Sequence, residues 1–141
     1  MTEIELRVKA AQATLDRFKS KPLKYGTNDC VRMVAMHLRK LGHRVVLPAS
    51  GAYTTVKSGL RELKARGFAN LAEAMDSFGF ERIAPAAAVV GDVLMLPGDS
   101  ELGSMVIALG NGRVIGYHED AKGACTLQPV EYAAAWRVRV V

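Results

Sequence analysis

The stretch "KYGTNDCVRM" (residues 24–33) decides the fold of this 141-residue chain. It ends a run of turn-forming residues, and either Asn28 or Asp29 is a good N-cap for a helix that begins at Cys30. A thiol at a helix start faces unpaired backbone N–H groups and the positive end of the helix dipole. Both favour the thiolate, which is the nucleophilic form of cysteine. The stretch therefore predicts either a tuned nucleophile at Cys30 or a small buried thiol.

A helix is expected on the N-terminal side of this stretch. Thr2 and Glu5 have the spacing of a capping box. The apolar residues that follow fall at helical intervals, and they are Ile4, Val8, Ala11, Leu15 and Phe18. This helix should end before Pro22, because a proline restricts the residue that precedes it.

Three more helices are expected on the C-terminal side. The helix that begins near Asp29 should end at Gly42, a good C-cap residue. A third should run from about Thr54 to Arg66. A short fourth should start at Asn70, which has capping-box spacing to Glu73, and end at Gly79.

After residue 80 the pattern changes to short β-branched runs bounded by turn residues. These runs are "GDVLMLPG", "SMVIALGNGRVIGYH", "ACTLQPV" and "AAWRVRVV". "GNGR" (residues 110–113) predicts a hairpin, because Asn-Gly suits turns that need positive φ. Helices first and strands second predict one α+β domain over residues 1–141, with N-terminal helices packed on a C-terminal antiparallel sheet.

Composition bounds the classes of function. The net charge is +5, but the basic residues are scattered and only 6% of residues are aromatic, so we expect no specific nucleic-acid binding. No apolar run approaches about 18 residues, so we expect no membrane span. The N-terminus has no apolar signal region, which predicts synthesis in the cytosol. Cys30 and Cys125 lack metal-site spacing, so we expect two thiols, no metal and no cofactor.

Four segments, in this order, resemble the NlpC/P60 superfamily of papain-fold cysteine peptidases. They are "YGTNDCVRMVAMHL", "GDVLML", "GSMVIALGNGRVIG" and "AAAWRV". The resemblance spans residues 20–140, and it is greatest to a small branch found in bacteriophages and prophages. It implies a papain-like fold in which Cys30 occupies the position of the nucleophile and Tyr25 is the aromatic residue beside it.

The resemblance also implies a departure from the active enzymes. Their strand similar to "SMVIALG" begins with the catalytic histidine, and the matching residue here is Ser104, or Met105 if the register shifts by one. A third polar position corresponds to Gly116. The phage branch tends to lack the histidine too. His118 follows Gly116 by two residues, so it is either a substitute base or an exposed residue near a strand end.

The remaining candidates have structural alternatives. Asp29 either caps the helix or forms hydrogen bonds near the thiol, where its charge would raise the thiol pKa. His37 lies about 10 Å from Cys30 along the helix axis, too far for a base. His43 is expected to be solvated, Asp92 to form a structural turn, and Cys125 to lie in the core.

The resemblance implies two functions of different class. The first is a phage tail-associated cysteine peptidase that acts on or docks at peptidoglycan, with Cys30 as nucleophile, His118 as candidate base, and Tyr25, Asp29 and Ser104 near the substrate. The second is a catalytically degenerate structural component of the tail or tail tip. A third, more distant one is thiol-dependent acyl transfer or assembly. Expected partners are other virion tail proteins and peptidoglycan, and the expected location is the virion after synthesis in the host cytoplasm.

Overall fold

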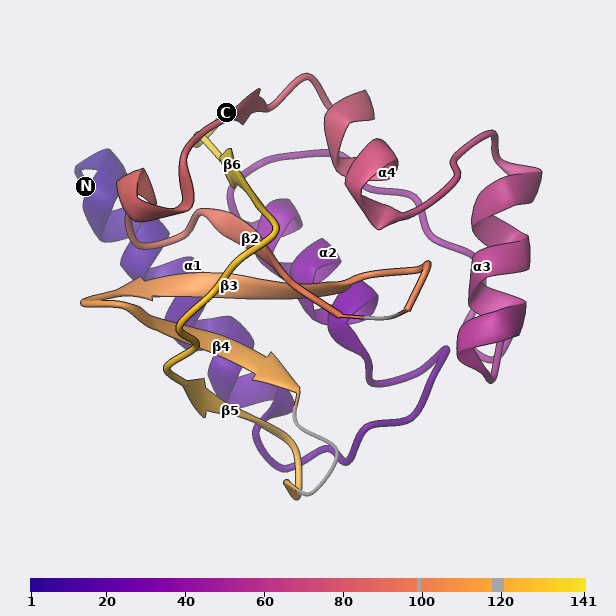
Figure 1. Cartoon of the computed structure of the whole chain (residues 1–141). Coiled ribbons are helices and arrows are strands. Elements are labelled where there is room, and N and C mark those ends of the chain that lie inside the picture. Colours follow the sequence, from indigo (N-terminus) through magenta and orange to yellow (C-terminus); the bar gives the residue numbers. More distant parts are fainter. Residues whose placement is uncertain (99, 118–120) are drawn as a thin grey trace.

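The computed structural model describes residues 1–98, 100–117 and 121–141. Within them the chain forms four α-helices, one 3₁₀ helix and a sheet of six strands (Figure 1). The helices are α1 (Glu3–Phe18), α2 (Cys30–Lys40), α3 (Val56–Ala65), α4 (Leu71–Ser77) and the 3₁₀ helix η1 (Pro85–Ala87). The strands are β1 (Glu81–Arg82), β2 (Val93–Leu96), β3 (Ser104–Gly110), β4 (Arg113–Tyr117), β5 (Ala124–Leu127) and β6 (Ala134–Arg137).

The helices begin at the caps that the sequence predicts. The Thr2 hydroxyl accepts a hydrogen bond from the Glu5 N–H at 3.2 Å, and α1 starts at the next residue. Asp29 caps α2, and Asn70 caps α4. For α3 the cap is Thr55, one residue after the expected start, and it forms a capping box with Ser58. A side-chain cap of this kind stabilises a helix by about 1 kcal/mol.

The buried face of α1 differs from the prediction. Its buried residues are Arg7, Ala10, Ala11, Thr14 and Phe18. Ile4 and Val8, which the periodicity assigned to the apolar stripe, are 54% and 49% exposed. The expected stripe was therefore wrong at its N-terminal end, and the helix is turned so that an arginine faces the protein.

Arg7 explains this orientation. Its Nε donates a hydrogen bond to the Val90 carbonyl at 2.7 Å, and its terminal nitrogens contact the Val138 carbonyl and the Asp92 carboxylate. Asp92 is fully buried and also pairs with Arg137 at 3.0 Å. The expected turn at Asp92 is thus also the centre of a buried ion network, and Arg7 lies on the buried face of α1, where it pairs with this charge.

The strands are antiparallel and follow the order β1-β6-β2-β3-β4-β5. The β3–β4 hairpin turns at Asn111 and Gly112, whose φ values are 55° and 74°, as Asn-Gly predicts. The two-residue strand β1 was not predicted, because it exists only through its pairing with β6.

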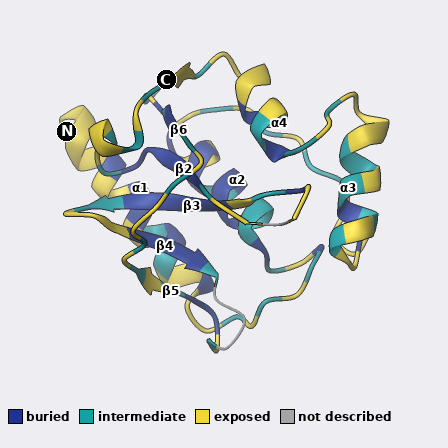
Figure 2. Ribbon diagram, viewed as in Figure 1, coloured by how far each residue is buried: buried dark blue, intermediate teal, exposed yellow. Residues whose placement is uncertain are grey.

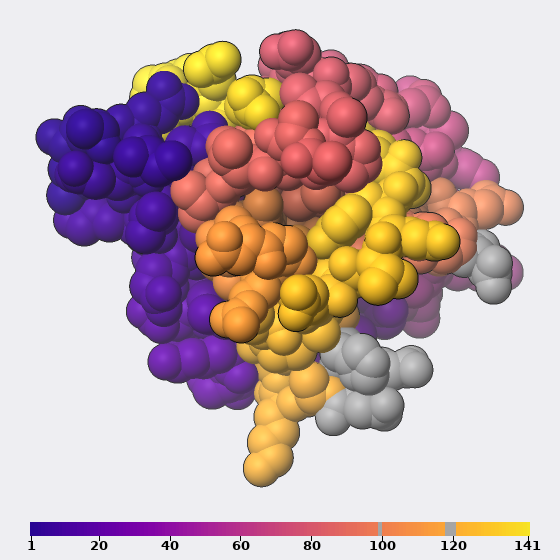
Figure 3. Space-filling view, turned by 60° about the vertical axis from the view of Figure 1, so that its left-hand side comes forward, coloured from indigo at the N-terminus to yellow at the C-terminus, as the bar shows by residue number. Residues whose placement is uncertain are grey.

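The sheet is covered on both faces. Helices α1 and α2 lie along one face, over a core that includes Met33, Leu38, Ile107 and Trp136 (Figures 1 and 2). The other face carries a smaller apolar cluster, and Ile83, Ala88 and Tyr132 pack against it from the connecting segments. In the space-filling view of Figure 3 the salmon segment before β2 lies beside the yellow C-terminal segment. Helices α3 and α4 stand beside these layers rather than on the sheet (Figure 1). The predicted α+β class, with N-terminal helices on a C-terminal antiparallel sheet, is confirmed.

Candidate functional site

Cys30 is the first residue of α2 and is half-buried, with its sulfur beside β3. Burial, and to a lesser degree the neighbouring Asp29 carboxylate, raises the pKa of this thiol to about 11. Backbone N–H groups of Met105, Cys30 itself and Val31 act in the opposite direction, because they stabilise the thiolate. The sulfur therefore faces several amide donors, yet it is a protonated thiol at neutral pH.

Asp29 organises the backbone before the thiol. The side chain is 2% exposed, and one of its oxygens accepts the Arg32 N–H at 2.8 Å. The other oxygen accepts the Gly26 N–H and the Tyr53 hydroxyl, each at 2.8 Å. Burial and this carboxylate raise the pKa of Tyr53 above its ordinary range. Asp29 is thus both the cap of α2 and a charged neighbour of Cys30, the two roles that the sequence left open.

The turn that carries Asp29 into place requires a glycine. Gly26 has φ +86°, and a Cβ there would lie 2.0 Å from the Tyr53 carbonyl oxygen. Tyr25 precedes it within the tight turn that Lys24 and Asn28 close, and its side chain is half-buried. The segment before the cysteine and the segment around Tyr53 are therefore packed against each other at the start of α2.

The sheet presents alternate residues to this site. Met105 belongs to the core under the helices, whereas Ser104, one residue earlier, is exposed and faces the opposite side. Gly116 also faces away, because a Cβ there would lie 2.8 Å from Val106 Cγ1 in the outer cluster. Ser104 and Met105 are the two residues that could match the catalytic histidine of the active enzymes. Met105 faces the Cys30 thiol, and Ser104 lies on the opposite side of the sheet.

Tyr117, the residue after Gly116 on β4, faces the core under the helices. Its ring packs edge-on against Phe18 with centroids 6.4 Å apart. Its hydroxyl is buried and has no hydrogen-bond partner among the described residues. Burial, and then the charges of Asp29 and Cys30, raises the pKa of Tyr117 above its ordinary range. A neutral phenol thus lies within electrostatic reach of the thiol.

The described histidines are engaged elsewhere. His37 is fully buried, and its Nε2 donates to the Gly91 carbonyl at 2.8 Å. Burial lowers its pKa, so the ring is neutral. His43 was expected to be solvated, but it is half-buried, packs on Phe80 and donates to the Arg139 carbonyl at 2.6 Å. His118 lies outside the described residues, directly after the last residue of β4.

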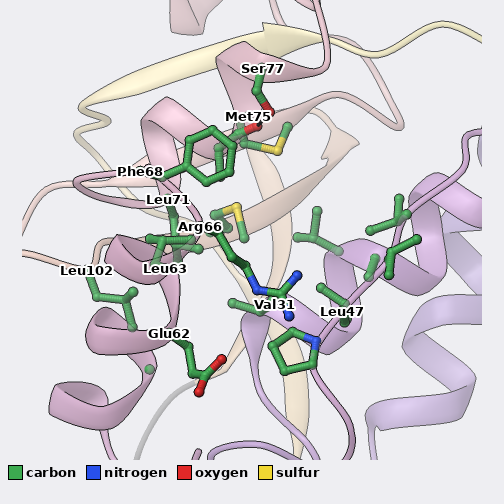
Figure 4. Close-up of a pocket in the computed structure, with 18 of the residues that line it drawn as sticks. Val31, Leu47, Glu62, Leu63, Arg66, Phe68, Leu71, Met75, Ser77 and Leu102 are labelled. Carbon is green, nitrogen blue, oxygen red and sulfur yellow. Dashed lines mark hydrogen bonds between the residues drawn. The ribbon is translucent and has the colours of Figure 1, made fainter.

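An apolar groove with a volume of about 240 Å³ opens beside this site, between α2, α3 and α4. We call it the α2–α4 groove, and Figure 4 shows how its side chains converge. Val31 and Met105, whose N–H groups face the Cys30 sulfur, both line it, as does Tyr53. Thiol and groove therefore share a wall, although Cys30 itself is not part of the lining.

Three of these features were not predicted from the sequence. Tyr53 lies in the loop between α2 and α3, and its bond to Asp29 joins residues 24 positions apart. Tyr117 was not predicted, because the family pattern points to Gly116, which lies on the opposite face of the sheet. The groove arises from helices that meet only in the folded chain.

Cys125 lies half-buried on β5, at the edge strand of the sheet. In the parts of the chain that the structure describes, no group of three metal-ligating side chains comes together. Over the same residues no helix has both the length and the apolarity to cross a membrane.

Comparison with known proteins identifies a family and a related fold. A family model described as "Domain of unknown function (DUF6950)" matches residues 5–138. The structure of NlpC2 from Trichomonas vaginalis is similar, with a TM-score of 0.60 over 95% of this chain at 13% identity. The chain spans about half of that protein, 47% of its length, and the likeness is one of fold. Comparison with curated proteins finds no significant match.

Proposed function

The chain belongs to the DUF6950 family, and from this premise and the setting of Cys30 we propose that it is an NlpC/P60-like domain of a phage tail that cleaves peptidoglycan. The observation that carries the proposal is the position of Cys30 at the first turn of α2, with backbone N–H groups from α2 and β3 directed at its sulfur. The similarity of fold to NlpC2 supports the same assignment.

The reaction that this arrangement suits is acyl transfer to a thiol. Cys30 Sγ attacks the carbonyl carbon of a peptide bond, and its proton passes to a base. Amide donors around the sulfur hold the negative charge that develops on the carbonyl oxygen. The amine leaves with a proton, and water then hydrolyses the thioester to restore the thiol.

A base is required, because a thiol with a pKa of about 11 is almost fully protonated at pH 7. Both described histidines donate to backbone carbonyls away from Cys30. We propose the third histidine of the chain, His118, as the base. Because Gly116 faces away from the thiol, this proposal rests on His118 being the one histidine outside the described residues, not on strand alternation. Tyr25 and Asp29 remain proposed residues of the substrate side, and other virion tail proteins remain the proposed partners. Ser104 is no longer among the proposed residues, because it faces the opposite side of the sheet.

The test is digestion of purified peptidoglycan by the full chain, with release of soluble peptides as the readout. We expect Cys30→Ala to abolish release and His118→Ala to reduce it at least about 100-fold, the usual contribution of a general base. His43→Ala is the matched control and should retain activity. Cleavage that survives in Cys30→Ala would overturn the assignment of the nucleophile.

A second candidate function is a structural component of the tail that has lost catalysis. Met105 favours it, because a thioether and its backbone stand where the active relatives of the resemblance carry an imidazole. The raised pKa of Cys30 favours it as well. A wild-type protein that releases no more peptide than Cys30→Ala, yet sediments with peptidoglycan or with tail proteins, would establish this second function.

A further inference from the structure

The α2–α4 groove has the character of a binding site for an aliphatic ligand. Most of its lining is apolar, and it includes Val31, Leu63, Leu71, Met75, Leu102 and Met105. These side chains come from three helices, from β3 and from the loop before it, so the groove exists only in the folded protein. Apolar surface left open to water at this depth favours a ligand that removes it from water.

Two charged side chains also line the groove, Glu62 and Arg66, both from the C-terminal half of α3 and its cap. Arg66 is exposed, and no carboxylate in the described parts of the chain pairs with it. Figure 4 shows Arg66 crossing the groove toward Val31, whereas Glu62 lies at the lower end of the view. An unpaired guanidinium over an apolar groove matches a ligand with an anionic head and an apolar tail.

The volume limits the length of the tail. A dry apolar cavity of about 150 Å³ holds benzene, which amounts to about 25 Å³ for each carbon atom. On that scale the groove, with its 240 Å³, accommodates on the order of ten carbon atoms. A phospholipid with two long chains exceeds this size, and a neutral alkane leaves Arg66 without a partner.

We propose that the α2–α4 groove binds a medium-chain fatty acid, with the alkyl chain between the helices and the carboxylate on Arg66. This site is separate from the proposed cleavage reaction, since Cys30 does not line the groove. The binding therefore does not depend on the proposed function, and the Cys30→Ala variant should bind as the wild type does.

The experiment is calorimetric titration of the full chain with sodium hexanoate, octanoate, decanoate and tetradecanoate. Each added CH₂ should tighten binding about four-fold up to about ten carbons, because one buried CH₂ contributes about 0.8 kcal/mol. Beyond that length the affinity should level off, since further carbons remain in water. A flat response to chain length would overturn the proposal.

Two pairs of variants locate the ligand. Ala74→Leu places a larger side chain in the groove and should weaken decanoate at least about ten-fold, whereas Ala65→Leu, exposed on α3 and outside the lining, should not. Arg66→Gln should weaken decanoate about five-fold and leave decanol unchanged, which is the effect expected of one exposed ion pair. Arg61→Gln is its control.

Equal effects within either pair of variants would contradict the assigned position. A further arm uses vesicles of phosphatidylglycerol. Flotation with vesicles in the absence of decanoate binding would identify a membrane surface instead of a free fatty acid, and would also overturn the proposal. Loss of peptidoglycan cleavage with intact decanoate binding would affect only the proposed function.

Discussion

The surroundings of the Cys30 sulfur act on its pKa in both directions, and their net effect favours the protonated thiol. Desolvation and the Asp29 charge raise the thiol pKa, and the amides of Met105 and α2 lower it. Among the residues that the structure describes, the neighbours that the sheet supplies are Met105, whose N–H faces the sulfur, and the neutral phenol of Tyr117. Catalysis at this position therefore requires a residue or a substrate that removes the proton during attack.

Because the pKa of Cys30 differs between the folded and the unfolded chain, the free energy of unfolding depends on pH. Folding raises the pKa of Cys30 from 9.0 to about 11, so the unfolded chain loses this proton first as the pH rises. The stability that Cys30 contributes is present below pH 9 and is lost between pH 9 and 11, by roughly 2 kcal/mol. Urea denaturation at pH 8 and pH 10.5 measures this loss.

The comparison should be made with Cys30→Ala, because the tyrosines also titrate in this range and are common to both proteins. The difference in unfolding free energy between wild type and variant should shrink by roughly 2 kcal/mol at the higher pH. A difference that stays constant would mean that the folded thiol titrates near its ordinary pKa.

At the scale of elements, α1 is held to the sheet by a charged side chain as well as by apolar contact. We expect Arg7→Met to lower the unfolding free energy by about 3–5 kcal/mol, because it removes donors from two carbonyls and from the buried Asp92. Ile4→Ser on the exposed flank of the same helix should change it by less than about 0.5 kcal/mol. Chemical denaturation of both variants decides whether the ion network or the apolar periodicity anchors α1.

The contrast between Arg7 and Ile4 also shows where sequence reasoning works. Caps at Thr2, Asp29 and Asn70 and the Asn-Gly turn were predictable, since each involves residues within a few positions. The orientation of α1 was not, because Arg7 and Asp92 are 85 residues apart.

Local sequence also does not predict which face of the sheet each side chain near Cys30 occupies. Counting from a family pattern left Ser104 and Met105 as alternatives, and one residue of register reverses the face that a strand side chain occupies. Only the pairing of β3 with its neighbours and its packing under α2 decide that Met105 faces the thiol. The helices and strands were thus predictable where local signals exist, and the residues around Cys30 were not.

At the scale of the whole molecule, α3 is less firmly packed than α2. Gly59 is the only buried residue of α3, whereas α2 has five. Segments with few buried contacts open at lower free energy than the core. We expect amide hydrogens of residues 56–65 to exchange at least about ten-fold faster than those of residues 30–40. Hydrogen exchange followed by mass spectrometry tests this, and equal protection of the two helices would contradict it.

The position of β6 has a consequence for how the protein is made. This strand, at residues 134–137, pairs with both β1 and β2 and so joins the edge strand β1 to the rest of the sheet. A ribosome releases residues 134–137 only after every other strand has emerged, and until then one side of β2 lacks its hydrogen-bonding neighbour. Assembly of the sheet is for this reason a late event in the life of the nascent chain, and an aggregation-prone edge must wait for the final strand to close it.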